Sequence, residues 1–254
     1  MQPGDFAHLY NLEEEFWWFA GMREITAAML DPVCAPMPDR QVLDAGCGTG
    51  GMMAWLQRYA RPENISGIDV TATALSFCRE RGQELLARAS VTDLPFPDAT
   101  FDLVTSFDVL AQLPGPGSDE SAISEMGRVL KPGGIAFIRV PAYEWMKSDH
   151  DRALGTQHRY SVPELERKME HAGFGVLRAT YANTFLLPLA LFRRLVLKPI
   201  GAAAAGSDVK PLPAGLGWAN RPLTAALRTE AFWLRRGRAK LSFGLSAICV
   251  ARKP

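Results

Sequence analysis

The sequence predicts an α/β fold in which helices cover both faces of a doubly wound, mostly parallel sheet. Short apolar runs alternate with helical patterns from residue 41 to residue 181, an alternation typical of βαβ units. A glycine cluster at residues 46–51 separates the first apolar run from the next helical pattern, as expected for strand, tight turn and helix. With 254 residues, 48% hydrophobic and 22% charged, the chain is long enough for one large domain that carries an insertion.

Residues 5–30 have a helical pattern with an aromatic row, Phe16-Trp17-Trp18-Phe19. Two adjacent Trp cannot share one helical face, so we expect one in the core and the other over a pocket. An aromatic stripe buried wholly in the core is the alternative. Arg23 follows this cluster, where a guanidinium needs an anion. After the helical pattern, a Pro-rich linker runs from Asp31 to residue 40.

The alternating region begins with a strand over 41–45 and a helix that runs to about residue 59. A second strand covers 65–69, and the helix over 71–81 has Thr71 as its N-cap candidate. Strands follow near 86–89 and over 101–106. Because ligands bind beyond the carboxyl ends of parallel strands, Phe107, Asp108 and Gln112 lie on the expected functional rim.

The second half continues with an amphipathic helix over 118–130, ended by Lys131-Pro132-Gly133-Gly134, and a strand over 135–140. Ser161 and Glu164 form a capping box at the start of a helix over 161–172. Strands follow over 174–181 and 241–251. Between them, residues 183–240 form an insertion with an apolar helix at 185–197, a Gly/Ala/Pro-rich stretch at 200–217 and a basic helix at 222–238.

The glycine loop, Asp44-Ala45-Gly46-Cys47-Gly48-Thr49-Gly50-Gly51, is suited to a nucleotide-type ligand. Glycines let the backbone approach a ligand closely, and a helix N-terminus offers free N–H groups. The spacing of Gly46, Gly48 and Gly51, with Asp69 further on, also satisfies the dinucleotide fingerprint. Asp44, however, would repel a pyrophosphate. It suits the sulfonium and ammonium of S-adenosylmethionine, so this cofactor is favoured over NAD.

The order of Asp44, Gly46, Gly48 and Gly50 resembles the first motif of class I S-adenosylmethionine-dependent methyltransferases. The aromatic row, Val140-Pro141-Ala142-Tyr143, residues 150–160 and the ending Phe243-Gly244-Leu245-Ser246 resemble a bacterial branch of that class, the methyltransferase type 11-like branch, often of unassigned substrate. The resemblance implies a Rossmann-like sheet of seven strands, with an antiparallel last strand after the insertion. It also implies a helical cap over the cofactor at 1–40, a core at 41–182, a basic helical lid at 183–240 and the last core strand at 241–254.

In several members of this class a Tyr, a Trp and an Arg close over the cofactor. Tyr10, Trp18 and Arg23 match those positions, with Trp17 the alternative to Trp18. Asp69, at the end of the second strand, is expected to accept hydrogen bonds from both ribose hydroxyls. Asp93 is expected to accept from the adenine amino group, and Leu94 to pack on the ring. The predicted cofactor contacts are Tyr10, Trp18, Arg23, Asp44, Gly46, Cys47, Gly48, Gly50, Asp69, Val70, Thr92, Asp93, Leu94, Phe107, Asp108 and Gln112.

The candidate bases gather in the loop after the strand at 135–140. His158 is the first choice, because an imidazole takes a proton from a hydroxyl near neutral pH. Tyr160 would orient either His158 or the acceptor, and His150 is the second choice for the base. A loop hydrogen bond between His150 and Asp151 is the alternative for that pair. Many relatives have Glu-His where this chain has Ala111-Gln112, which removes a base there. No compact metal-ligand motif is present, so we predict no metal.

Composition bounds the partners and the compartment. Four widely spaced Cys without a Cys-x-x-Cys pattern, and no secretory signal, favour a reducing cytoplasm. Residues 182–254 hold twelve Lys and Arg against two acids, a net charge of +10, which leaves −9 for the remainder. The basic insertion favours an anionic or lipid-linked acceptor. A hydrophobic acceptor lid, a peripheral membrane contact through 185–198 and a homodimer interface remain open alternatives.

We therefore expect a cytoplasmic enzyme that transfers a methyl group from S-adenosylmethionine to a small molecule, at oxygen, and releases S-adenosylhomocysteine. Methylation at nitrogen or carbon, and a cofactor-binding protein without transferase activity, are the alternatives. The sequence has neither a base-flipping motif nor interleaved aromatic and basic residues, so we do not expect a nucleic-acid acceptor. The acceptor's identity and the oligomeric state do not follow from the sequence.

Overall fold

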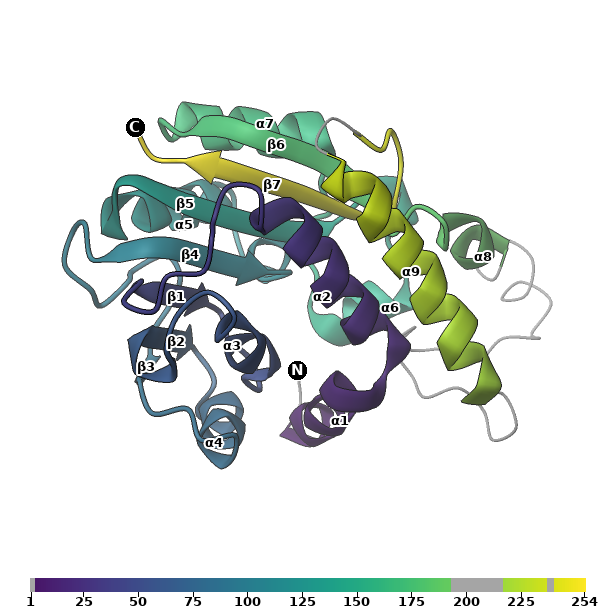
Figure 1. Ribbon diagram of the computed structural model, residues 1–254, viewed down its shortest axis with the longest axis horizontal. Coiled ribbons are helices and arrows are strands. Elements are labelled where there is room, and N and C mark those ends of the chain that lie inside the picture. Colours follow the sequence, from purple (N-terminus) through teal and green to yellow (C-terminus); the bar gives the residue numbers. More distant parts are fainter. Residues whose placement is uncertain (1–2, 193–216, 237–239) are drawn as a thin grey trace.

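The computed structural model describes residues 3–192, 217–236 and 240–254 and contains a seven-stranded sheet of order β3-β2-β1-β4-β5-β7-β6. The strands are β1 (Val42–Ala45), β2 (Ile65–Asp69), β3 (Leu86–Arg88), β4 (Phe101–Phe107), β5 (Leu130–Pro141), β6 (Gly175–Ala182) and β7 (Ser246–Arg252). β1 to β5 pair in parallel, and β7 runs antiparallel to both β5 and β6 (Figure 1). This arrangement confirms the predicted doubly wound sheet with an antiparallel last strand.

The direction in which strands are added reverses between β1 and β4. From β1 the chain adds β2 and then β3 on one side, and β4 and β5 follow on the other. The four residues of β1 are all buried, as expected of a central parallel strand covered on both faces. Such a reversal leaves a crevice beyond the carboxyl ends of the central strands, and the glycine loop after β1 lies there.

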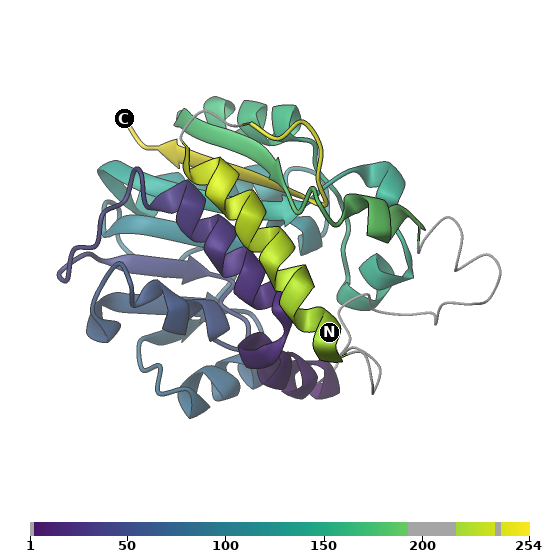
Figure 2. The ribbon, with the colours of Figure 1, turned by 45° about the vertical axis from the view of Figure 1, so that its right-hand side comes forward.

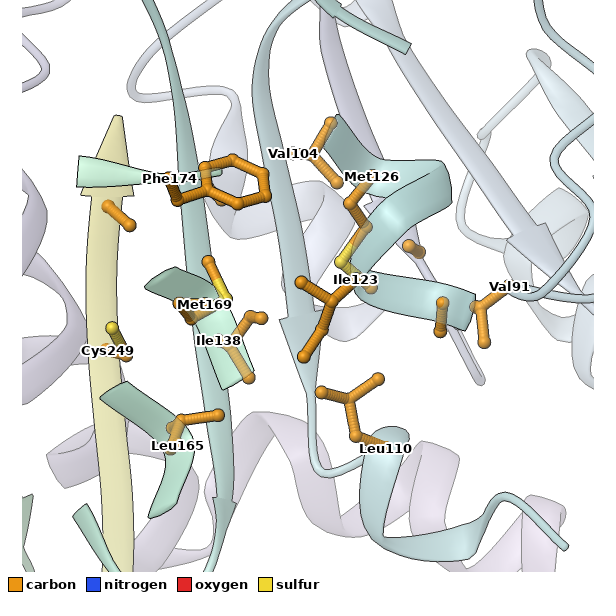
Figure 3. Packing of buried hydrophobic residues seen from close by; sticks show 14 of the residues in the cluster. Val91, Val104, Leu110, Ile123, Met126, Ile138, Leu165, Met169, Phe174 and Cys249 are labelled. Atoms are coloured by element: carbon orange, nitrogen blue, oxygen red, sulfur yellow. The ribbon is translucent and has the colours of Figure 1, made fainter. Parts of the chain in front are cut away.

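Helices cover both faces of the sheet. They are α1 (Pro3–Glu15), α2 (Trp17–Leu30), α3 (Gly51–Leu56), α4 (Ala72–Glu80), α5 (Ser118–Val129), α6 (Asp149–Leu154), α7 (Val162–His171), α8 (Leu187–Phe192) and α9 (Asn220–Arg235), with single 3₁₀ turns at Pro62–Asn64, Leu110–Gln112, Glu144–Met146 and Gly217–Ala219. Side chains of α2, α3, α4 and α9 form one buried cluster, and those of α5 and α7 form the other. Figure 3 shows the second, where Ile123 and Met126 lie near Ile138 of β5.

α2 and α9, far apart in the sequence, lie side by side across one face of the sheet (Figures 1 and 2). Gly21 permits this contact, because a Cβ atom there would lie 2.2 Å from Leu227 Cδ1. Arg178 of β6 donates to Ala28 O and Leu234 O, at 2.7 and 2.6 Å. The insertion is thus anchored on the N-terminal segment through α9.

The N-terminal segment is two helices rather than the single helix predicted over residues 5–30. The break is at Phe16, whose extended backbone (φ −77°, ψ 127°) separates α1 from α2 while its side chain stays buried. The break lets α2 follow the sheet face while α1 packs against α3 and α4. Burial of Phe16 overrides the local helical preference, which a helical pattern alone cannot reveal.

Other boundaries also differ from those predicted. β5 begins at Leu130 rather than at residue 135, β7 begins at Ser246 rather than at 241, and α3 ends at Leu56 rather than near residue 59. The basic helix runs over Asn220–Arg235, and the part of the predicted apolar helix that is described forms α8 (Leu187–Phe192). Residues 193–197 of that helix and nearly all of the Gly/Ala/Pro-rich stretch lie outside the described residues. No helix in the described part of the chain is long and apolar enough to cross a membrane.

Candidate active site

A cavity of about 850 Å³ lies beyond the carboxyl ends of the strands, at the crevice that the strand order predicts. Its lining comes from α1 and α2, from the turns after β1, β2, β3, β4, β5 and β6, from the start of β7, and from α6 and α8. The strand order places the glycine loop and its acids at one end, the acid-lined end, and Leu186 and Leu245 at the other, the apolar end. Phe16, Trp17 and Leu154 are further apolar residues of the lining.

The glycine loop is fixed by its backbone conformation and by β2. Gly46, Gly48 and Gly50 all have positive φ angles, of 88°, 52° and 84°, which favour glycine. A Cβ atom on Gly46 would lie 2.3 Å from Val109 Cγ2, so this residue could not carry a side chain without a shift. The N–H groups of Gly46 and Cys47 donate to Ile68 O at 2.9 and 2.8 Å. The loop therefore presents bare backbone to the cavity.

Asp44 is the most constrained acid of the site. Its side chain lines the cavity, is 1% exposed and accepts a hydrogen bond of 2.9 Å from Thr105 Oγ1. Burial raises its pKa to about 7, with nearby Glu13 and Asp69 adding to the shift and Thr105 and Arg139 opposing it. No described cation pairs with this carboxylate. A cationic ligand atom in the cavity would therefore stabilise its ionised form.

Asp69, at the end of β2, organises the adjacent turn. Its Oδ2 accepts from Gly48 N at 3.1 Å and its Oδ1 from Thr71 N at 2.8 Å. The carboxylate lines the cavity beside Val70, Ala89, Ser90 and neighbouring residues. Lone pairs remain for hydroxyl donors, as the predicted ribose contact requires.

α1 is fastened over the glycine loop by buried charges. Glu13 is 7% exposed, lines the cavity and accepts from Thr49 Oγ1 at 2.6 Å and from Arg81 Nη2 at 3.1 Å. Burial raises the pKa of Glu13. Arg81 also donates to Tyr10 O at 2.8 Å and lies over the Tyr10 ring at 4.1 Å. Tyr10 therefore holds α1 in place through Arg81 and does not line the cavity.

A buried arginine, Arg139, belongs to the cavity wall. Arg139 of β5 is 5% exposed, and its Nη2 is 2.6 Å from Asp108 Oδ2. Its guanidinium lies 5.1 Å from the ring centroids of both Trp18 and Phe107. Arg139 is the charged residue inside the apolar run 135–140, a pattern that could have indicated a functional side chain but that was not used in predicting the site.

The structure separates the predicted cofactor contacts into two groups. Those that line the cavity are Trp18, Asp44, Gly46, Cys47, Gly48, Asp69, Val70, Phe107, Asp108 and Gln112. Those that do not are Tyr10, Arg23, Gly50, Thr92, Asp93 and Leu94. Leu94 is 3% exposed in the hydrophobic core, and Ala89, Ser90 and Val91 line the cavity near that turn instead. Trp17 and Trp18 both line the cavity, whereas only one was expected to.

Of the predicted catalytic residues, His158 and Tyr160 are not among those that line the cavity. His158 Nε2 is 2.7 Å from Glu164 Oε1, and its Nδ1 is 3.4 Å from Glu144 Oε2. Tyr160 is buried in the core, where its hydroxyl donates to Asp119 Oδ2 at 2.8 Å, and burial raises its pKa. His150 belongs to α6, and its side chain is not among those described.

The loop after β5 instead brings an ion pair to the cavity. Asp151 and Arg159 both line it, are 1% and 5% exposed, and are joined by a 2.7 Å contact from Arg159 Nε to Asp151 Oδ1. Asp151 thus pairs with Arg159, and the pair predicted between Asp151 and His150 stays a prediction because the side chain of His150 lies outside the described part of the structure. The described residues contain no group of three His, Cys, Asp or Glu side chains placed to hold a metal ion.

Two features test whether the site fits S-adenosylmethionine. Asp44 supplies a buried negative charge beside a bare glycine cradle, which matches a cationic sulfur and ammonium. Asp69 lines the same cavity and keeps lone pairs for the ribose hydroxyls. Arg23, the predicted partner of the cofactor's carboxylate, does not line the cavity, and its Nη2 donates to Glu13 O at 2.8 Å. The residues present therefore fit the group that the sequence predicted.

Comparisons with known proteins agree. A family model described as a methyltransferase domain matches residues 43–138. A fatty-acid O-methyltransferase of Mycolicibacterium smegmatis is 32% identical over 153 residues, 59% of this chain and 49% of that protein, so the match spans about half of that relative's length. A protein of the same organism, named "Probable S-adenosylmethionine-dependent methyltransferase", is 28% identical over 254 residues, 96% of this chain and 92% of the relative.

The fold likeness extends to solved structures. That of geranyl diphosphate C-methyltransferase from Streptomyces coelicolor, in complex with Mg²⁺, geranyl diphosphate and S-adenosylhomocysteine, has a TM-score of 0.57 at 16% identity, covering 90% of this chain and 78% of that one. At this identity the likeness concerns the fold.

Proposed function

We propose that this chain, which belongs to the class I S-adenosylmethionine-dependent methyltransferases, methylates an oxygen atom of a small, largely apolar molecule. The observation that carries the proposal is the continuity of the cavity, in which an acid-lined end and an aromatic and aliphatic end share about 850 Å³. Pockets of this kind bury most of an apolar ligand and orient it through a few polar groups.

The acid-lined end holds the cofactor. Asp44 and Asp69 would face its cationic and ribose parts, and the bare backbone of Gly46 and Gly48 would allow close approach. When bound, S-adenosylmethionine supplies a methyl group on a positively charged sulfur, so that a C–O bond forms as the C–S bond breaks and its electron pair returns to sulfur. The chain's own task is to align the acceptor and to exclude water.

The apolar end receives the acceptor. Of the described insertion residues, only Asn183, Leu186 and Ala190 line the cavity, and all three are uncharged. The arginines of α9 do not reach it. The insertion's positive charge, which favoured an anionic acceptor in the sequence, therefore gives no direct support for one within the described part of the wall. The name of one relative, a fatty-acid O-methyltransferase, supports an acceptor with an apolar chain.

Transfer to a hydroxyl oxygen also requires that its proton leave, and His158 is the base that the sequence predicts. If His158 acts as this base, His158→Ala lowers kcat while the affinity for S-adenosylhomocysteine is unchanged. If it serves only to join Glu144 and Glu164, the same change lowers thermal stability and leaves kcat intact. Measuring kcat and melting temperature on one preparation separates these outcomes.

A screen for released S-adenosylhomocysteine tests the function itself. The purified protein would be incubated with S-adenosylmethionine and a panel of apolar alcohols, phenols, amines and acids, and methylated products identified by mass spectrometry. We expect a methyl ether or ester from an apolar member. Tight binding of S-adenosylhomocysteine without turnover on any member would favour a binding protein that does not transfer, and a product methylated at nitrogen or carbon would correct the assignment to oxygen.

A further inference from the structure

Asn183 lines the cavity and carries a buried polar atom that has no hydrogen-bond partner among the described residues. The residue follows β6 and is 3% exposed, and the atom is its Oδ1. Burying an amide oxygen without a partner is costly, and native structures rarely do it without a reason. A ligand that donates a hydrogen bond would supply the partner.

The backbone around Asn183 is held in place by α9. Glu230, which is completely buried, accepts hydrogen bonds from the backbone N–H groups of Asn183, of Thr184 at 2.7 Å and of Phe185 at 3.2 Å. The hydroxyl of Thr184 donates to Phe243 O. Asn183 itself has a φ of 64°, a left-handed conformation that Asn tolerates better than most residues. This turn is thus fixed with its side chain at the cavity wall.

Position in the sheet places Asn183 at the acceptor end rather than at the glycine loop. The register aligns Ala182 with Ser246, and Ser246 with Pro141. Ser246 and Pro141 also line the cavity, together with Leu186 and Leu245. β7 and β5 lie between β6 and β4 in the sheet, so the turn that carries Asn183 is several strands away from Asp44.

The charges of the cavity argue against an ionised acceptor near Asn183. Each of the two arginines in the described lining, Arg139 and Arg159, is already bonded to an aspartate. A carboxylate ligand would meet the amide oxygen and these acids without a free cation in the described lining. A neutral O–H or N–H group could instead donate a hydrogen bond to Asn183 Oδ1, which has no partner among the described residues.

We propose that Asn183 selects the acceptor by accepting a hydrogen bond from a neutral hydroxyl or N–H group on an otherwise apolar molecule, and that it disfavours ionised carboxylates. Glu230 is the positioning residue that holds the turn. This inference rests on the proposed function and deepens it, since it distinguishes an apolar alcohol, phenol or amine from a fatty-acid anion.

Two variants that preserve the backbone test the proposal. Asn183→Gly removes the side chain and Asn183→Asp keeps acceptor oxygens, and both residues tolerate a positive φ. The probes are two matched pairs, 1-octanol with octanoate and 4-butylphenol with 4-butylbenzoate. Each is titrated calorimetrically at pH 8 into protein saturated with S-adenosylhomocysteine, so that the acids are ionised and no transfer occurs.

We expect the wild type to bind each alcohol or phenol about tenfold more tightly than its acid, the effect of roughly one buried hydrogen bond. Asn183→Gly should lose about five- to tenfold in affinity for the hydroxyl probes, while Asn183→Asp retains it and binds the acids still less well. Affinity for S-adenosylhomocysteine should stay within about twofold in both variants, because the residue faces the acceptor end.

The outcomes separate this inference from the proposed function. Equal binding of hydroxyl and acid probes, tighter binding of the acids, failure of both to bind the cofactor-loaded protein, or no change in Asn183→Gly would each overturn the selection role. If the discrimination is found but no hydroxyl probe is methylated when S-adenosylmethionine replaces S-adenosylhomocysteine, the selection role stands and O-methylation fails. If a probe is methylated equally by wild type and Asn183→Gly, the function stands and the selection role fails.

Discussion

Replacing Asp44 by Asn should weaken cofactor binding while stabilising the protein without ligand. The carboxylate is 1% exposed, and burial is the main cause that raises its pKa to about 7. Asn has nearly the same shape and can still accept the hydrogen bond from Thr105 Oγ1, so the change removes the charge and little else. Opposite effects on folding and binding are expected where an acid is kept for a cationic ligand.

The magnitude for binding follows from ionisation of Asp44. With a pKa of about 7, the carboxylate is about 9% ionised at pH 6 and about 91% ionised at pH 8. If the bound cation keeps it ionised throughout, S-adenosylmethionine should bind wild-type protein about tenfold more tightly at pH 8 than at pH 6, or about 1.4 kcal/mol. Asp44→Asn should lose this dependence, and it shares every other titrating group with the wild type.

The effect on stability has the opposite sign. Because the folded-state pKa lies above the ordinary aspartate value of 3.8, the folded protein holds this proton more tightly than the unfolded chain does. Stability is therefore lost as pH rises from about 4 through about 7. Asp44→Asn should recover up to about 4 kcal/mol at pH 8, as an upper bound, and less at pH 5.

Calorimetric titration with S-adenosylmethionine at pH 6 and pH 8, and urea unfolding at pH 5 and pH 8, measure the two effects on the same pair of proteins. The reasoning fails if Asp44→Asn binds the cofactor as well as the wild type does at pH 8. It also fails if the variant is less stable than the wild type at pH 8, or if both proteins show the same pH dependence of affinity.

Three further changes probe the same end of the cavity. Asp69→Ala should weaken S-adenosylhomocysteine binding by about 1.5–3 kcal/mol through lost charge-assisted hydrogen bonds, and unchanged affinity in calorimetry would contradict the ribose contact. Arg81→Ala leaves Glu13 buried without its cation, so the free energy of unfolding should fall by about 3–5 kcal/mol. Amide hydrogen exchange should rise first in α1, and a uniform rise over the chain would argue against a local role of this ion pair in holding α1. Gly46→Ala should destabilise by about 1–3 kcal/mol more than Gly117→Ala, because both have positive φ but only Gly46 faces a close neighbour; equal melting temperatures would remove the role assigned to Val109.

Much of the sheet could be predicted because its strands are short apolar runs bounded by turn-forming residues such as glycine and proline. The glycine loop, the capping box at Ser161 and the return to β6 follow from local chemistry. The break at Phe16 and the extension of β5 back to Leu130 do not, since each depends on what the segment packs against. Lys131-Pro132-Gly133-Gly134 has the composition of a loop, yet the structure assigns it to the strand.

The candidate site divides in the same way. Asp44, Gly46 and Asp69 were predictable because a strand end and a glycine turn fix where they point. Asn183 gave no signal, because its exposure to the cavity depends on Glu230, 47 residues further along the chain. Tyr160 and His158 had the right chemistry for catalysis, but the sequence could not tell that the loop turns Arg159 toward the cavity instead.

Calorimetric titration of the purified protein with S-adenosylhomocysteine and, separately, with NAD⁺ tests most directly which cofactor the acid-lined end accepts. We predict one S-adenosylhomocysteine site per chain and no binding of NAD⁺, whose pyrophosphate would meet Asp44 in a buried position. Binding of NAD⁺ in place of S-adenosylhomocysteine would contradict the role assigned to Asp44, and with it the methyl transfer proposed for this cavity.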